Sequence, residues 1–189
     1  MTTASDSAAA QRVHGEPTRI IQRGLWFEEF SEGTIYAHRP GRTVTEADNV
    51  LFTTLTMNTQ ALHLDAAWSA TQPGFGGQRL INSMFTLSTV VGLSVSQLTQ
   101  GTLVANLGFS EVAFPAPLFA GDTLYAETEC VGKRESRSRP GEGVVHLVHT
   151  GRNQDGVVVA RAARATLVRR QPTVGTPAGA DAHGIHTEE

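Results

Sequence analysis

The chain has 189 residues, of which 40% are hydrophobic and 17% charged, and this composition predicts one globular domain with a substantial core. The formal net charge of −3 argues against nucleic acid as the main partner, because phosphate binding needs clustered Lys and Arg. A single cysteine excludes intramolecular disulfides. The sequence has no apolar run of membrane length and no signal-peptide pattern, so we expect a soluble, cytoplasmic protein.

Both ends of the chain are predicted to be disordered. Residues 1–18 are small and polar without periodicity, and residues 171–189 are rich in Gly, Pro and Ala. His183 and His186 lie in the second tail, where a solvated role is favoured over metal binding. We therefore expect a folded domain over residues 19–170, with no metal and no separate cofactor.

The first predicted elements lead to a polar segment that carries one histidine. Residues 35–45 mix β-branched and polar side chains, which predicts a strand or extended arm. Thr45 begins a Thr-Glu-Ala-Asp capping box with Asp48, which predicts the start of a helix. The helix carries an apolar stripe at helical spacing, made of Val50, Leu51 and Leu55. A polar, non-periodic segment with His63 follows, and Asp65 is a good N-cap for a second, short helix.

The rest of the chain changes from a helical to a strand-like period. Residues 79–98 form the longest apolar segment and predict a helix that is buried on most sides. Four antiparallel strands are expected after it, over residues 102–110, 123–132, 144–152 and 157–169, with a charged hairpin loop at 133–143 and a turn at 153–156. His146 and His149 should face opposite sides of their strand and cannot share a metal. The fold class is therefore α+β, with a long central helix and a curved antiparallel sheet.

The order of elements and the run MNTQALH resemble the MaoC-like, or R-specific enoyl-CoA hydratase, branch of the hot-dog fold. In that family a capped helix ends in Gly-Asp-x-Asn-Pro-x-His, whose Asp and His form the catalytic pair. Here Met57 takes the place of the glycine, Asn58 that of the catalytic aspartate, and Gln60 that of the asparagine. His63 keeps the place of the histidine. The resemblance extends over roughly residues 25–170 and implies a single hot-dog domain whose overhanging helix–loop segment carries the site.

Two further runs strengthen the resemblance. RLINSM is similar to the family's Arg-Ile-x-His-Gly-Met, with Asn82 replacing the histidine and Ser83 replacing the glycine whose backbone N–H holds the thioester carbonyl. FPAPLFAGDTL is similar to a strand–turn of the family. The stretch TEADNVLFTTLTMNT also resembles a subset of hydratases of branched dicarboxylyl-CoA esters, namely mesaconyl-CoA, β-methylmalyl-CoA and itaconyl-CoA.

The resemblance implies a hydro-lyase that adds or removes water across the α,β bond of an enoyl-CoA thioester, with coenzyme A present only as part of the substrate. It implies His63 and Asn58 as catalytic residues. Candidate substrate-binding residues are Gln60, Asn82, Ser83 and Arg79, and Arg79, Lys133, Arg134 and Arg169 are candidates to meet coenzyme A phosphates.

Asn58 is the main departure from the family, because an amide cannot take a proton. In one interpretation Asn58 and Gln60 only hold water or substrate, and His63 alone moves protons. In another, a carboxylate of the substrate assists. A thioesterase and a non-catalytic acyl-CoA-binding subunit are the alternative functions. Short edge strands and a buried central helix favour a homodimer with the acyl site between subunits.

Overall fold

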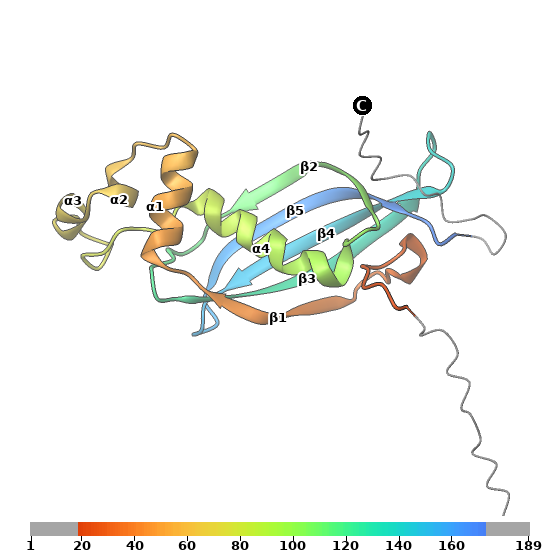
Figure 1. Ribbon diagram of the computed structural model, residues 1–189, viewed down its shortest axis with the longest axis horizontal. Coiled ribbons are helices and arrows are strands. Elements are labelled where there is room, and N and C mark those ends of the chain that lie inside the picture. Colours follow the sequence, from red (N-terminus) through yellow and green to blue (C-terminus); the bar gives the residue numbers. More distant parts are fainter. Residues whose placement is uncertain (1–18, 173–189) are drawn as a thin grey trace, which may run out of the picture.

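The computed structural model of the protein describes residues 19–172, so the predicted tails lie outside the described residues except for residues 171 and 172. The elements, labelled in Figure 1, are a 3-10 turn at Phe27–Glu29, β1 (Ile35–Thr43), α1 (Glu46–Leu55), α2 (Ala61–Leu64), α3 (Ala66–Ala70), α4 (Ser83–Leu98), β2 (Leu103–Ala113), β3 (Thr123–Glu135), β4 (Glu142–Arg152) and β5 (Val158–Arg169). None of the helices in this described part of the chain is long and apolar enough to cross a membrane.

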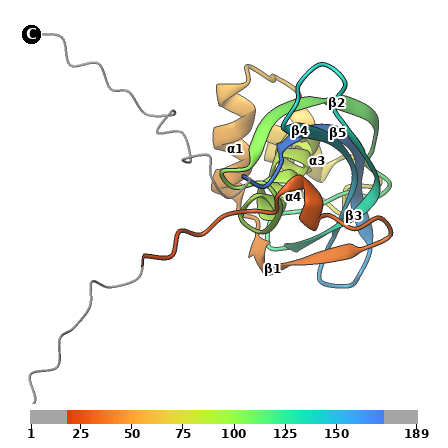
Figure 2. The same ribbon diagram turned by 90° about the vertical axis from the view of Figure 1, so that its right-hand side faces the viewer.

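The five strands form one antiparallel sheet in the order β1-β3-β4-β5-β2. The sheet curves around α4, while α1, α2 and α3 project at one end (Figures 1 and 2). The predicted α+β class, with a central helix wrapped by a curved sheet, is confirmed, and so is the overhanging segment. The strands β1 and β2 form the two edges, and their 9 and 11 residues show that the expectation of short edge strands was wrong.

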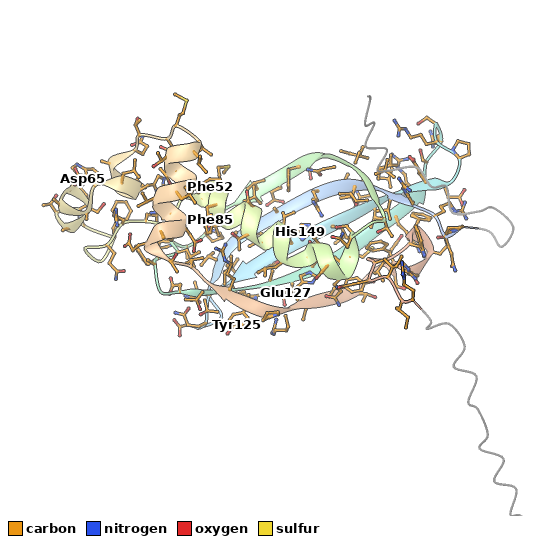
Figure 3. The ribbon with its side chains drawn as sticks, viewed as in Figure 1. Phe52, Asp65, Phe85, Tyr125, Glu127 and His149 are labelled. Carbon is orange, nitrogen blue, oxygen red and sulfur yellow. The ribbon has the colours of Figure 1, made fainter. Side chains whose placement is uncertain are left out.

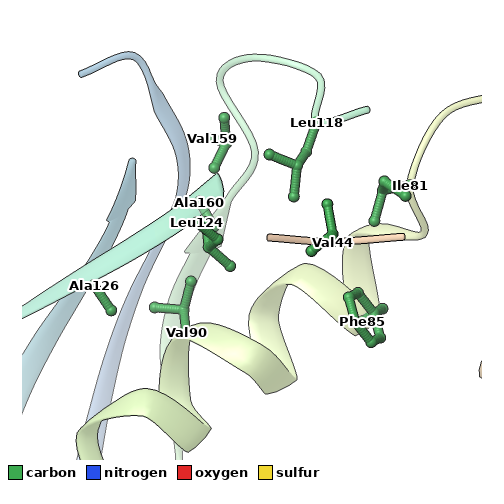
Figure 4. Packing of buried hydrophobic residues seen from close by; sticks show 9 residues of the cluster. All are labelled: Val44, Ile81, Phe85, Val90, Leu118, Leu124, Ala126, Val159 and Ala160. Atoms are coloured by element: carbon green, nitrogen blue, oxygen red, sulfur yellow. The ribbon is translucent and has the colours of Figure 1, made fainter. Parts of the chain in front are cut away.

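The core lies between α4 and the concave face of the sheet. Figure 4 shows Val90 of α4 packed against Leu124 of β3 and Ala160 of β5, beside Phe85 and Ile81 near the start of the helix. The helix can approach this closely because residue 151 of β4 is glycine; a Cβ there would come within 2.4 Å of the Val90 Cγ2 atom. Burying such apolar side chains is the main force that holds α4 in place.

The structure corrects the sequence prediction in three places. The long helix begins at Ser83, because Leu80 forms a bridge with Phe119 and Asn82 caps the helix with its side chain. The charged loop is shorter than predicted, since β3 continues to Glu135 and β4 starts at Glu142. The segment around His63 is a helical turn, α2. The sequence did not predict it, because four residues are too few to show a helical period.

Candidate active site

The first helix is fixed at its N-terminus by the predicted capping box. The Thr45 hydroxyl accepts a hydrogen bond from the backbone N–H of Asp48 at 3.2 Å, and the Asp48 carboxylate accepts one from the backbone N–H of Thr45 at 2.9 Å. Hydrogen bonds to Thr45 and the charge of Arg42 lower the pKa of Asp48 in spite of the opposing effect of burial, so Asp48 is a poor proton acceptor. Its structural role at the helix end, which was favoured over a catalytic one, is consistent with this geometry.

Asn49 connects the overhanging segment to the rest of the domain. Its fully buried amide donates hydrogen bonds to the backbone carbonyls of His63, at 3.0 Å, and Leu80, at 3.1 Å. Its amide oxygen accepts a bond from the backbone N–H of Asn82 at 2.9 Å. One side chain therefore ties α1 to α2 and to the start of α4. Sequence reasoning missed Asn49; the signal was the pair Asn49 and Thr53, two polar residues four apart on the buried side of a helix.

His63 is held in one tautomer. Its Nδ1 atom lies 2.9 Å from the carbonyl oxygen of Leu80. A carbonyl can only accept, so Nδ1 carries the proton and Nε2 has a lone pair when the ring is neutral. No hydrogen bond to Nε2 is formed within residues 19–172. The imidazole is buried, and its orientation is fixed through the same Leu80 carbonyl that Asn49 contacts. Such an imidazole can act as a general base through Nε2.

The start of α4 offers a hydrogen-bond donor three residues after Leu80, whose carbonyl binds His63. Asn82 is the N-cap: its amide oxygen accepts a bond from the Met84 N–H at 3.0 Å, and its amide nitrogen donates to the Thr53 hydroxyl at 3.2 Å. Because both ends of its buried side chain are occupied, Asn82 positions the helix and offers no free polar atom to a substrate. The Ser83 N–H makes no hydrogen bond within the described part of the chain, and it lies at the positive end of the α4 dipole.

A mostly apolar cavity of about 240 Å³ opens beside that donor. It is lined by the start of α4, the segment that follows β2 and the start of β5, namely Leu80, Ile81, Ser83, Thr86, Phe114–Leu118 and Val159. His63 contacts this lining through Leu80. The cavity therefore includes Ser83, and the His63 imidazole, which is not itself a lining residue, is linked to the lining through the Leu80 carbonyl. Figure 3 shows the neighbouring aromatic pair, Phe52 of α1 and Phe85 of α4, whose ring centroids lie 5.6 Å apart.

The structure does not bring the other motif residues into this site. Asn58 is half-buried, and its side-chain oxygen accepts a hydrogen bond from the backbone N–H of Gln60 at 3.0 Å, as in an Asx turn. Gln60 is exposed and precedes α2 as its N-cap residue. Met57 has a φ of 56°, in the left-handed region that favours glycine, which explains why the family motif has glycine at this position.

The basic residues that were candidates to meet coenzyme A phosphates lie at separate places in the domain. Arg79 forms an ion pair with Glu46 and donates a hydrogen bond to the Leu64 carbonyl at 3.2 Å, so it braces α1 against α2. Lys133 donates to three carbonyls of the segment around the 3-10 turn, among them that of Phe30. Arg134 is exposed at the far end of the sheet and Arg169 is exposed near it. Among residues 19–172, no group of three or more His, Cys, Asp or Glu side chains is placed to hold a metal ion.

A curved antiparallel sheet around one helix, with an overhanging segment that carries a histidine, defines a hot-dog domain. A family model described as "MaoC like domain" matches residues 27–153. The chain belongs to this MaoC-like family.

The similar proteins include a β-methylmalyl-CoA dehydratase of Chloroflexus aurantiacus, 31% identical over 82% of this chain and 43% of that protein. A mesaconyl-CoA hydratase of Cereibacter sphaeroides is 32% identical over 79% of this chain and 43% of its own length. A solved structure from Mycobacterium tuberculosis, described as having a double hot-dog fold, superimposes with a TM-score of 0.68 and 25% identity over 79% of this chain and 45% of that one. The chain thus spans less than half the length of these three relatives.

Proposed function

We propose that the protein adds water to, or removes it from, the α,β bond of a short branched dicarboxylyl-CoA thioester of the mesaconyl-CoA or β-methylmalyl-CoA type. The observation that carries this proposal is the fixed imidazole of His63, whose Nδ1–H is bound to the carbonyl of Leu80, a residue that lines an apolar cavity together with Ser83 at the start of α4. The similarity to relatives with these names supports the choice of substrate class.

In the proposed reaction, Nε2 of His63 takes a proton from water as the oxygen attacks Cβ of the enoyl thioester. The resulting enolate oxygen accepts a hydrogen bond from the Ser83 N–H, where the α4 dipole favours negative charge. The His63 imidazolium then returns the proton to Cα, which completes the addition. Asn58 takes no part in proton transfer, because its oxygen already accepts from Gln60 and an amide has no basic site.

A second copy of the chain is proposed to complete the functional unit. Three residues of β2 pair with Val168, Arg164 and Ala162, which alternate along the concave side of β5, and remain partly exposed: Leu103 at 37%, Phe109 at 40% and Val112 at 39%. Arg164, opposite Phe109, is buried with its Nε and Nη2 atoms unpaired among the described residues. Partly exposed apolar residues beside a buried, unpaired arginine fit a surface that a second hot-dog domain covers. The relatives supply the length for such a domain, because this chain spans less than half of each of them.

The test is to mix the protein with mesaconyl-CoA, itaconyl-CoA and crotonyl-CoA while the absorbance of the conjugated thioester is followed. We expect the signal to fall with the dicarboxylyl esters, and the His63→Ala variant to be slower by about 10²–10⁴-fold. His146→Ala is the matched control, because His146 is exposed on the convex face of β4. If no ester loses its conjugation, the hydratase proposal fails. Free thiol released under the same conditions would indicate a thioesterase instead.

A further inference from the structure

An apolar groove, separate from the His63-side cavity, lies between α1 and α4. It has a volume of about 370 Å³ and is lined mostly by apolar atoms of Arg42, Phe52, Phe85, Ser88, Thr89, Gly92 and Leu93. Val90 and Ser94 of α4 are buried against the sheet, whereas Ser88 and Gly92 are exposed, so the groove opens on the side of α4 that faces away from the sheet. Leaving such a groove open to water is unfavourable, and we therefore expect a group that covers it.

The two sides of α1 are reversed relative to an ordinary surface helix. The polar Asn49 and Thr53 are buried, whereas Leu51 and Leu55, four residues apart, are exposed. Leu55 also follows Phe52, which lines the groove, at a spacing of three residues, so these two side chains share one side of the helix. A helix that turns leucines outward beside an apolar groove is arranged for a contact on that side.

The second copy proposed above does not supply this contact. Arg42, which lines the groove, is on β1, and β1 and β2 are the opposite edges of the sheet. A copy that pairs along β2 therefore leaves the groove uncovered. The occupant must come from elsewhere, and one segment of the same chain is well placed.

This segment is the arm, here defined as residues 19–23. Its Ile20 and Ile21 side chains are 89% and 79% exposed, although isoleucine is among the residues most often buried in proteins. The arm is anchored where it joins the domain: the Gly24 N–H donates to the Gln100 carbonyl at 2.8 Å, and the Leu25 N–H donates to the Leu98 carbonyl at 3.0 Å. Two adjacent isoleucines in water on an anchored segment form an apolar surface that lacks a partner.

The arm begins within reach of the groove. In Figure 2 it leaves the domain beside α4, on the side that the sheet does not cover. Along α4, Leu98 and Gly92 are about 9 Å apart, at roughly 1.5 Å for each residue. An extended chain from Gly24 to Ile20 spans roughly 13 Å, at about 3.3 Å for each residue. Ile20 can therefore reach Gly92 while the hydrogen bonds of Gly24 stay in place.

We propose that the arm folds back along the outer face of α4, so that Ile20 and Ile21 cover the Gly92 end of the groove in the same chain. Gly92 favours this contact, because nothing lies within 4 Å of the place where a Cβ would be and the approaching side chains meet bare backbone. The closed arm buries apolar surface between α1 and α4 and so holds the overhanging segment against the central helix. This inference does not depend on the proposed function.

Disulfide trapping tests where the arm lies. On mild oxidation, Ile20→Cys with Gly92→Cys should form a bond within one chain at least tenfold faster than Ile20→Cys with Val131→Cys. Val131 is an exposed residue of β3, and the Gly33 N–H binds the carbonyl of the residue before it, so the control samples the sheet close to the start of the chain. The native Cys130 is buried and does not compete. Equal rates for the two pairs, or a bond formed only between two chains on a non-reducing gel, overturn the proposal.

Polar substitutions test whether the isoleucines are covered. If they stay in water, Ile20→Ser with Ile21→Ser should have no effect, because exposed side chains contribute little to stability. With the arm closed, this double variant should lower the midpoint of thermal unfolding by about 3 °C. It should also raise the fluorescence of a dye that binds apolar surfaces, and the amide hydrogen exchange of α1, by about twofold or more.

The matched control is Ile35→Ser with Val157→Ser, which removes two exposed aliphatic side chains at other places in the domain. It should leave the midpoint, the dye fluorescence and the exchange of α1 unchanged. An arm variant that behaves like wild type, or a control that behaves like the arm variant, overturns the proposal. None of these measurements uses hydratase activity, so their outcome stands whether or not the protein hydrates an ester.

Discussion

His38 and His149 form hydrogen bonds to the same hydroxyl, that of Thr128, at 2.7 Å on either side. His38 Nδ1 also lies 2.8 Å from the Gln97 side-chain oxygen, which can only accept, so Nδ1 of His38 carries the proton. In the neutral ring Nε2 then accepts from Thr128, and the Thr128 oxygen accepts from Nδ1–H of His149. The chain of bonds crosses β1, β3 and β4 beneath α4 and needs the His38 imidazole to be neutral, because its Nε2 atom must accept; Figure 3 labels His149.

This buried pair predicts loss of stability in mild acid. Burial, with the charges of Arg164 and His38, lowers the pKa of His149 from 6.5 to about 3, and burial lowers that of His38. Because both folded-state pKa values are lowered, the unfolded chain takes up protons below about pH 6.5 that the folded chain does not yet bind, and for His149 this difference persists to about pH 3. Stability should therefore be full above about pH 7 and fall by up to about 1.4 kcal/mol per pH unit for His149 as the pH drops toward 3.

Urea denaturation between pH 7.5 and 4.5 measures this slope. The part of this window above about pH 5.5 isolates the histidines, since carboxylates whose pKa is lowered, such as Glu28, Glu29 and Asp48, begin to lose their contribution only below that. His149→Gln should flatten the curve, and Arg164→Met should make it shallower because a repelling charge is removed. His146→Gln, on the exposed face of the same strand, should leave it unchanged. A wild-type stability that is constant from pH 7.5 to 4.5 would contradict the prediction.

Replacing Asn49 with leucine should loosen the whole site. The variant leaves the His63 carbonyl, the Leu80 carbonyl and the Asn82 N–H without partners in a buried region. Unpaired buried groups cost about 1–3 kcal/mol each, so we expect a loss of about 3 kcal/mol in the free energy of unfolding after relaxation. Asn49→Asp keeps the acceptor but places a buried carboxylate against the carbonyl oxygens of His63 and Leu80, so it should cost at least as much. Denaturation curves and hydration rates measure both effects.

The control for this prediction is Thr54→Val. The Thr54 hydroxyl is exposed and bonds only to the Val50 carbonyl one turn back, so its loss should change stability by less than about 0.5 kcal/mol. If Asn49→Leu were as mild as Thr54→Val, the anchoring role of Asn49 would be wrong.

Met57→Gly should stabilise the protein. The residue has a φ of 56° and its side chain is 87% exposed, so the substitution relieves a left-handed backbone and loses little packing. A non-glycine residue pays about 1–2 kcal/mol for this conformation, of which the greater unfolded-state freedom of glycine offsets part. We expect a net gain of about 0.5 kcal/mol, read from thermal unfolding. Thr59→Gly, two residues away, should give no gain; a lower stability of Met57→Gly would refute the argument.

Lysine substitutions on β2 test the proposed dimer interface. Phe109→Lys with Val112→Lys places two cations on the concave side of β2, which the proposed second copy covers. Light scattering on a sizing column should report a dimer for wild type and a monomer for this variant. Val131→Lys, on the exposed face of β3, is the control and should remain dimeric. A monomeric wild type, or a dimeric double variant, would contradict the proposed interface.

Much of the fold was predictable because its signals are local. The capping box at Thr45, the cap at Asp65 and the turn over residues 153–156 each act within a few residues, and all three are confirmed. The opposite orientation of His146 and His149 follows from strand alternation and is confirmed as well. The start of the long helix was missed because the Leu80–Phe119 bridge depends on residues 39 positions apart, which no local pattern reports.

The site was predictable only in part. His63 was found by its motif, but the partners that fix it are backbone groups, and backbone groups leave no trace in a sequence. Asn82 and Arg79 stay predictions as substrate-binding residues; in the structure the Asn82 side chain bonds to Thr53 and Met84, and Arg79 bonds to Leu64 and Glu46. Asn49 was overlooked because an asparagine within a helix is expected to be exposed to solvent, and only the tertiary packing shows that it is fully buried.

The way Asn49 holds this segment has a consequence for how the protein can diversify. The Asn49 amide forms hydrogen bonds only with main-chain atoms of His63, Leu80 and Asn82, so these bonds do not depend on the neighbouring side chains. The residues between α1 and the histidine are therefore free to change over evolutionary time while the imidazole keeps its position. A lineage can in this way exchange an aspartate for Asn58, and one acyl preference for another, without rebuilding the frame that carries the histidine.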